Sequence, residues 1–178
     1  MPSPLKFALI LLTLTWLGGC APIPYGESQF NLVAASSSNE WERRISREPG
    51  EIQFTTQLEQ GSHSQVIFPN ANNEHEIPFR IVFSDLDCDT GHEVKLEYRA
   101  NPNDIYSKYF NTIIPWQTPV QLHIQWDKEG VVSVTLKEET IEFLPHKRFS
   151  KVKFRSLSGE LPINHFSYSR LDKVPTNE

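Results

Sequence analysis

From Trp41 onward, apolar and polar residues alternate along the chain with a period of two. Every second side chain is apolar in residues 93–99, and the same alternation runs through 120–126 and 132–136. This period places the apolar side chains on one face of an extended chain, which is typical of strands that bury one face. The sequence Asp-Lys-Glu-Gly at 127–130 separates the last two segments, so together they predict a β-hairpin.

Other short segments rich in aliphatic and aromatic residues predict further strands. They are residues 52–58, 65–68, 79–83, 140–143, 152–155 and 166–170. About nine strands at this spacing, with turn residues between them, predict an all-β antiparallel sandwich. Only one segment of any length is a candidate helix, residues 40–48, which end just before Pro49 and Gly50.

The N-terminal residues carry the signals of export. Lys6 precedes an apolar run, residues 7–17, which is shorter than the roughly 20 residues of a membrane-spanning helix. The run ends in Leu17-Gly18-Gly19-Cys20, which resembles the lipobox of bacterial lipoproteins. The resemblance implies a signal peptide over residues 1–19, cleavage before Cys20 and a lipid group on the Cys20 thiol. An ordinary secretory signal with a chance cysteine is the alternative.

The rest of the chain divides into a tether, one domain and a short tail. Residues 20–39 contain Pro, Gly and a run of Ala and Ser without a regular period, which predicts a flexible tether. The patterned segments fall within 40–172, the predicted sandwich domain, and 173–178 form a C-terminal tail. Because residue 21 is Ala rather than Asp, the lipoprotein resemblance implies the outer membrane as the destination.

The order of elements in the second half of the chain resembles a known superfamily. Pro115-Trp116 precedes the alternating strand and its hairpin partner, and a closing strand follows Ser158-Gly159. Over residues 116–170 this order resembles the second half of a concanavalin A-like jelly roll, the superfamily of legume lectins, laminin G-like modules and several glycan-cleaving enzymes. The resemblance favours a jelly roll over an immunoglobulin-like sandwich, which remains the alternative.

Catalytic motifs of that superfamily are incomplete in this chain. No strand has the Glu-x-Asp-x-Glu pattern of its glucanase branch. Gln121-Leu122-His123 resembles the Gln-Ile-His strand motif of alginate lyases with this fold, but the Arg-rich strand and the Tyr-Lys-containing C-terminal strand of their site have no counterpart. His123 is therefore interpreted as an outward-facing side chain, and a glycan-cleaving enzyme is the less favoured reading.

An acidic connection between two predicted strands is a candidate metal site. Asp85, Asp87 and Asp89 alternate there, and carboxylates at this spacing can converge on a hard cation such as Ca²⁺. The alternative is a solvated turn in which the Asp side chains cap their own backbone. The adjacent Cys88 is expected to be a buried, inert thiol.

A second candidate site is rich in aromatic residues. Tyr106, Tyr109 and Trp116 crowd a segment that also contains Asn and Pro. Sugar-binding sites use aromatic faces to stack on pyranose rings, with amides and carboxylates hydrogen-bonding the hydroxyls. The sequence therefore predicts these three residues as ligand-binding, with core packing under a long loop as the alternative.

Charge narrows the range of partners. The chain has 17 Lys and Arg against 22 Asp and Glu, a net charge of −5, which disfavours a nucleic-acid partner. Lys151, Lys153 and Arg155 share one side of a strand and could meet an anionic glycan. The sequence thus favours an outer-membrane lipoprotein, held by its lipid anchor, whose β-sandwich is a non-catalytic glycan-binding module. An assembly or accessory factor that binds envelope proteins is the alternative.

Overall fold

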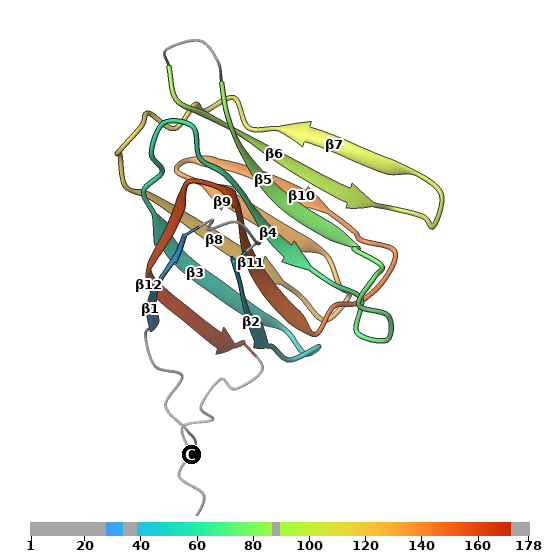
Figure 1. The fold of residues 1–178 in the computed structure, drawn as a ribbon. Helices are drawn as coiled ribbons and strands as arrows, with labels where there is room; N and C mark the ends of the chain where they lie inside the picture. Colours follow the sequence, from blue (N-terminus) through green and yellow to red (C-terminus); the bar gives the residue numbers. More distant parts are fainter. Residues whose placement is uncertain (1–27, 34–38, 87–89, 172–178) are drawn as a thin grey trace, which may run out of the picture.

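The computed structural model describes residues 28–33, 39–86 and 90–171, which form twelve β-strands and contain no helix (Figure 1). The strands are β1 Ser28–Val33, β2 Asn39–Arg44, β3 Gly50–Thr56, β4 His63–Phe68, β5 Phe79–Asp85, β6 His92–Arg99, β7 Ile105–Tyr109, β8 Val120–Trp126, β9 Val132–Leu136, β10 Glu139–Phe143, β11 Lys151–Ser158 and β12 Glu160–Arg170. Within these ranges, no helix has the length and hydropathy needed to cross a membrane.

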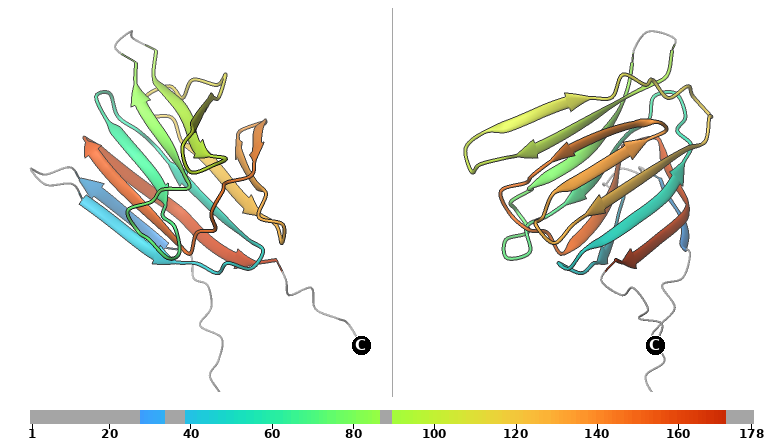
Figure 2. Two further views of the ribbon diagram at one scale, coloured as in Figure 1. Left: turned by 90° about the vertical axis from the view of Figure 1, so that its right-hand side faces the viewer. Right: turned by 180° about the vertical axis from the view of Figure 1, so that it is seen from behind.

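The strands form two six-stranded antiparallel sheets that pack face to face (Figure 2). Sheet 1 has the order β1-β12-β3-β8-β9-β10, and sheet 2 has the order β2-β11-β4-β5-β6-β7. Strands β8 to β10 and strands β4 to β7 pair in chain order, whereas other neighbours are distant in sequence, as in the pairing of β3 with β12 and of β4 with β11. The prediction of an all-β antiparallel sandwich is therefore confirmed.

The core lies between the sheets and is built by the period-two alternation. In β8, Leu122 and Ile124 are fully buried, while the intervening residues face outward. Aromatic rings fill much of the interior: Phe68 stacks on Phe79 with 4.1 Å between ring centroids, and Phe154 meets Phe54 edge to face at 5.0 Å. Burying a side chain of this size stabilises the fold by about 1.5–3 kcal/mol.

Two N-terminal segments differ from their predicted structures. Residues 39–44, which comprise the last residue of the predicted tether and the first five of the predicted helix, form the strand β2, which pairs with β11. Residues 28–33, within the predicted tether, form β1, which pairs with β12, so the sandwich begins earlier than residue 40. The reason is tertiary: Phe30 of β1 stacks on Trp41 of β2 with 4.3 Å between ring centroids, and Trp41 also packs against Phe154. Long-range packing thus overrides a weak local preference.

Several predicted features lie outside the described residues. They are the signal peptide, the lipid site Cys20, the acidic residues Asp87 and Asp89, the thiol of Cys88 and the C-terminal tail from residue 173.

Candidate functional site

The outward face of sheet 1 carries a dense array of polar side chains. Because Leu122 and Ile124 turn inward, β8 presents Gln121, His123 and Gln125 on the opposite face. The register places Gln53 of β3 on one side of His123 and Thr135 of β9 on the other. We call this surface the polar face. It consists of Glu51, Gln53, Thr55, Gln121, His123, Gln125, Ser133, Thr135, Lys137, Thr140, Glu142, Asn164, Ser167 and Ser169.

A hydrogen-bond network fixes the middle of the polar face. His123 Nε2 lies 2.9 Å from Glu51 Oε2, and Gln125 donates its amide N–H to the same oxygen at 3.2 Å. Ser169 donates its hydroxyl to Glu51 Oε1 at 2.8 Å. Burial raises the pKa of the Glu51 carboxyl, but the hydrogen bonds from Ser169, His123 and Gln125 outweigh it and lower this pKa overall. Glu51 is therefore a carboxylate that holds His123 in one orientation.

Two hollows lie along this face. Gln53, Gln121, His123, Thr135 and Lys137 line a shallow depression of about 310 Å³. A second hollow of about 410 Å³ continues along β8 and β9, past the Gln125–Ser133 pair to the ends of the strands. Its lining includes Trp126, Val131 and Leu171. Residues 121–127 span roughly 20 Å of extended chain at about 3.4 Å per residue, so the surface suits an elongated polar ligand.

The three predicted aromatic ligand residues do not come together in the structure. Tyr106 and Tyr109 lie on β7, where residues three apart point to opposite faces. Tyr106 stacks on Tyr98 with 5.6 Å between ring centroids, whereas Tyr109 pairs with Lys95 on the outer face of sheet 2. Trp116 is half-buried and donates its indole N–H to Asp85 Oδ1 at 2.9 Å. The three side chains thus contact different residues and do not line one surface.

Asp85, the one described residue of the predicted cation site, is surrounded by N–H donors. Its Oδ1 accepts from Trp116, and its Oδ2 accepts from the backbone N–H of Gly61. Desolvation raises the pKa of Asp85, but hydrogen bonds from Gly61, Trp116 and the backbone of Leu86 outweigh it and lower the pKa. Among the described residues, no group of three or more His, Cys, Asp or Glu side chains could hold a metal ion. A Ca²⁺ site with Asp87 and Asp89 stays a prediction.

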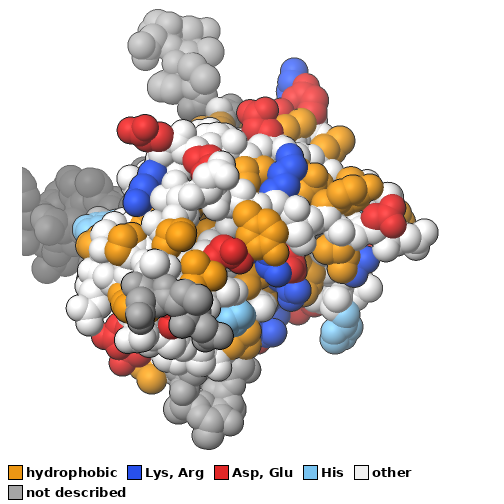
Figure 3. Space-filling view, turned by 90° about the horizontal axis from the view of Figure 1, so that it is seen from above, with side chains coloured by type: hydrophobic (Ala, Val, Ile, Leu, Met, Phe, Trp, Pro, Cys, Tyr) orange, Lys and Arg blue, Asp and Glu red, His pale blue; other side chains and the backbone are white. Residues whose placement is uncertain are grey.

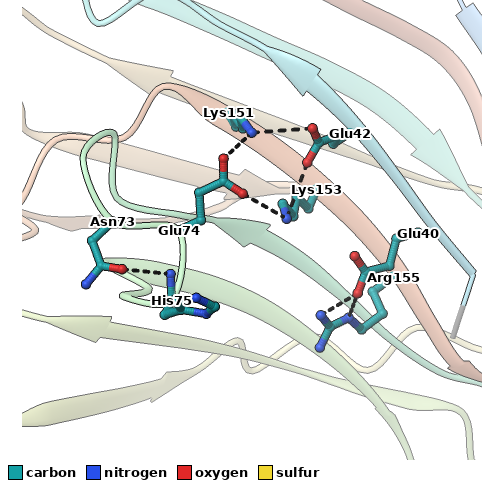
Figure 4. A network of polar contacts seen from close by, with 8 residues as sticks. All are labelled: Glu40, Glu42, Asn73, Glu74, His75, Lys151, Lys153 and Arg155. Carbon is teal, nitrogen blue, oxygen red and sulfur yellow. Dashed lines mark hydrogen bonds and ion pairs between the residues drawn. The ribbon is translucent and has the colours of Figure 1, made fainter.

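The predicted basic stripe on β11 is neutralised within sheet 2. Lys153 lies 3.3 Å from Glu42, and Arg155 pairs with Glu40 on the neighbouring strand β2 (Figure 4). Lys151 contacts Glu42 and Glu74, the latter in the connection between β4 and β5. Because each cation has a carboxylate partner, this stripe is a set of cross-strand ion pairs and offers little net positive charge to an anionic glycan.

A buried Ser–His contact was not evident from the sequence. Ser62 Oγ lies 2.8 Å from His92 Nε2, and Ser62 donates its hydroxyl to the carbonyl of Glu59. Both side chains are fully buried, so the hydroxyl is out of reach of a substrate. Among the described residues, His92 Nδ1 has no hydrogen-bond partner, and burial lowers the pKa of this histidine. The contact is a structural feature of the core rather than a nucleophile and its base.

The sequence pointed to Gln121 and His123 but not to the residues that lie beside them on other strands. Glu51 and Gln53 lie some seventy residues earlier in the chain, Thr135 lies on the next strand, and Lys137 lies in the turn that follows that strand. Their outward direction follows from the alternation within each strand. Their position beside His123 follows from the strand order and register, which a single sequence does not contain.

Comparison with known proteins identifies the fold. No family model matches the chain, and no curated protein matches its sequence significantly. Among solved structures, an alginate lyase from Pseudomonas aeruginosa is similar with a TM-score of 0.58 and 15% identity, over 73% of this chain and 68% of that one. Sheep galectin-11 is similar with a TM-score of 0.53 and 13% identity, over 75% of this chain and 98% of that one. An alginate lyase from Alteromonas sp. 272 is similar with a TM-score of 0.56 and 12% identity, over 85% of this chain and 91% of that one.

These similar structures are jelly-roll β-sandwiches of the concanavalin A-like type, and this chain has the same fold. The preference for a jelly roll over an immunoglobulin-like sandwich is therefore confirmed. At identities of 15% or less, the likeness establishes the fold alone.

Burial of His92 predicts an acid-sensitive fold. Its pKa is lowered in the folded state, so the unfolded chain binds more protons near and below the ordinary histidine pKa of about 6.5. The stabilisation is present above that pH and is lost as the pH falls through the folded-state pKa. We expect His92→Gln to weaken the decline in the free energy of unfolding as the pH falls below about 6.5, measured by urea denaturation.

The control is His75→Gln, which changes an exposed histidine and should leave the decline as it is. His63, whose pKa is also lowered by burial and by Lys95 and Arg80, contributes part of the remaining decline. An equal pH dependence in wild type and His92→Gln would contradict the assignment.

Proposed function

We propose that this protein is a lipoprotein of the bacterial outer membrane whose jelly-roll domain binds a glycan through the polar face of sheet 1 and does not cleave it. The observation that carries the proposal is the arrangement of Gln53, Gln121, His123 and Thr135 around one depression. The fold adds support, because similar structures include alginate lyases, which act on a polysaccharide, and galectins, which bind glycans.

The chemistry of the polar face suits sugar hydroxyl groups. Gln and Asn side chains each offer donors and an acceptor, and Ser and Thr hydroxyls offer both, so neighbouring sugar hydroxyls can be paired in either direction. The side chains stand on adjacent strands of a rigid sheet, which reduces the entropy lost on binding. The second hollow adds apolar surface at one end from Leu171, which is exposed, and from Val131, which is half-buried, and the carbon face of a sugar ring can rest there.

The same surface argues against cleavage. His123 is held by Glu51, and the outward positions of the described strands of sheet 1 include neither Tyr nor Arg. The chain therefore has the Gln-x-His element of the lyase motif without the Arg-rich and Tyr-containing partners that complete it. On this proposal, Gln121 and His123 bind and orient the glycan, and the binding surface lies apart from Tyr106, Tyr109 and Trp116.

Membrane anchoring through Cys20 is the second part of the proposal. It rests on the sequence Leu17-Gly18-Gly19-Cys20. Cleavage before Cys20 would make this cysteine the first residue of the mature chain, with its thiol carrying the lipid. The first described strand, β1, begins only eight residues later, at Ser28. The sandwich would therefore stand within a few nanometres of the membrane surface, given at most about 3.5 Å per extended residue.

Glycan binding predicts a specific loss on changing the polar face. We expect the double variant Gln121→Ala and His123→Ala to weaken binding to any hit on a glycan array by about tenfold or more, because each lost hydrogen bond costs about 0.5–1.5 kcal/mol. Tyr109→Ala serves as the control and should bind as the wild type does. Equal affinity in the double variant and the wild type, or loss only in Tyr109→Ala, would place the site elsewhere.

Lipidation predicts a covalent label at Cys20. Cells grown with a fatty-acid analogue should mark the wild-type protein, and Cys20→Ala should remain unlabelled because it lacks the thiol that carries the lipid. Cys88→Ala is the matched control, since it removes the other cysteine and should keep the label. Label on Cys20→Ala would rule out this anchor.

A further inference from the structure

The strand β7 is an open sheet edge with unusually apolar exposure. It is the last strand of sheet 2, and within the described residues no strand pairs with its outer side. Three of its five side chains are large and exposed: Ile105 by 57%, Tyr106 by 44% and Tyr109 by 53%. The other two residues of β7 are Ser107 and Lys108. Figure 3, which looks onto the molecule from above, shows hydrophobic side chains exposed among charged ones.

The other three sheet edges differ from β7. Strand β2 carries Glu40, Glu42, Arg43 and Arg44, and β10 carries Glu139 and Glu142, and such charges discourage pairing with another strand. Strand β1 has no charged residue, but Val33 is its only large exposed hydrophobic side chain among the described residues. In the sheet orders, β7 and β10 lie at the opposite side of the sandwich from β1 and β2 (Figure 1).

The register shows which backbone groups of β7 face outward. Phe110 donates its N–H to the carbonyl of Val94, and this pair continues the register in which Tyr109 lies opposite Lys95. Hydrogen-bonded pairs alternate along an antiparallel ladder, so Lys108 and Tyr106 also bond to β6. The N–H and C=O groups of Ile105, Ser107 and Tyr109 therefore point to the free edge, where they are able to pair with another strand.

We infer that β7 is a homodimerisation edge, at which a second copy of this chain adds its own β7 antiparallel across a two-fold axis through Ser107. This register forms about six backbone hydrogen bonds, two in each of three residue pairs between the copies. Ile105 pairs with Tyr109 of the second copy, Ser107 with Ser107 of the second copy, and Tyr109 with Ile105 of the second copy. The two sheets 2 then join into one continuous sheet.

The side chains of β7 are self-complementary in this register. Ile105 lies opposite Tyr109 of the second copy, which joins two exposed apolar side chains on the same face. Lys108 lies opposite Tyr106 rather than opposite another Lys108, so its ammonium meets an aromatic ring and no like charge. Lys108 already makes such a contact within one chain, with Nζ 5.9 Å from the centre of the Tyr98 ring. A second copy of β7 therefore fits this edge with no charge repulsion.

The contact is small, so the dimer is weak. A single five-residue edge buries less than the roughly 800 Å² per partner of a standard stable interface. We expect a dissociation constant between about 10 µM and 1 mM. Sedimentation velocity should be run on residues 21–178, which include all the described strands and lack the predicted lipid site.

Two variants of β7 should abolish association. Ile105→Glu places a carboxylate opposite the ring of Tyr109 of the second copy, whose negative face repels an anion. Ser107→Pro removes an N–H that faces the free edge while leaving the bonds to β6 intact. Val33→Glu is the matched control, because it adds the same charge at an exposed position of β1, an edge of sheet 1, and it should dimerise like the wild type. Circular dichroism checks that each variant is folded.

Cross-linking tests the register without relying on a disruptive variant. The two-fold axis brings the two Ser107 Cα atoms to about 5.5 Å, within the range that a disulfide spans. In a Cys88→Ser background, Ser107→Cys should form a disulfide-linked dimer at least tenfold faster than Thr140→Cys, an exposed position on β10. A wild type that stays monomeric to about 1 mM, a dimer that persists in both β7 variants, or equal cross-linking at the two positions would each overturn the inference.

Discussion

The antiparallel register of β3, β8 and β9 is the constraint on which the candidate site depends. Its pairs place Gln53, His123 and Thr135 in one row and Glu51, Gln125 and Ser133 in the next. A slip of one residue in β8 would turn Leu122 and Ile124 to solvent and bury His123 in the core. The burial of those two aliphatic side chains therefore selects the register, and the register assembles the polar face.

Aromatic packing between the two sheets holds the strands of the polar face in place from the core side. Phe154 of sheet 2 packs against Phe54 and Phe166 of sheet 1, and Trp41 packs against the same Phe166. These contacts join the two sheets under β3 and β12, whose outer sides carry Glu51 and Ser169. The hydrogen bonds of Glu51 to three side chains then restrict motion on the polar face itself. A ligand would thus meet side chains that are already ordered, which lowers the entropic cost of binding.

Much of the fold could be predicted from sequence because alternation is a local signal. The segment 120–126 was predicted with the bounds of β8, and the hairpin from β8 to β9 forms as expected. Strands β1, β2 and β7 were missed for a different reason. Strand β1 does alternate, but only two of its inward side chains are apolar: Phe30, which is half-buried, and Leu32, which is buried. Phe30 and Trp41 are stabilised by each other and by contacts with Phe154, which lies more than a hundred residues away in sequence. Strand β7, Ile105–Tyr109, is exposed at every position and therefore has no period-two pattern of burial.

The candidate site was predictable only in part, for the same physical reason. The residues Gln121 and His123 were recognisable from their own strand, but Glu51 reaches His123 across a separation of 72 residues. The aromatic site predicted from Tyr106, Tyr109 and Trp116 assumed that neighbours in sequence share a surface. In the structure, β7 directs its two tyrosines to opposite faces, and Trp116 is bound to Asp85.

The most direct test of glycan binding at the polar face is to map where a glycan contacts the domain. Amide and side-chain NMR signals of residues 21–178 would be followed during titration with a neutral oligosaccharide found to bind, beside an alginate oligosaccharide for comparison. Binding at the polar face predicts shifts that cluster on β3, β8 and β9, including the side-chain amides of Gln53, Gln121 and Gln125 and the ring of His123. Shifts confined to β7, to the Trp116 segment or to the outer face of sheet 2 would contradict it.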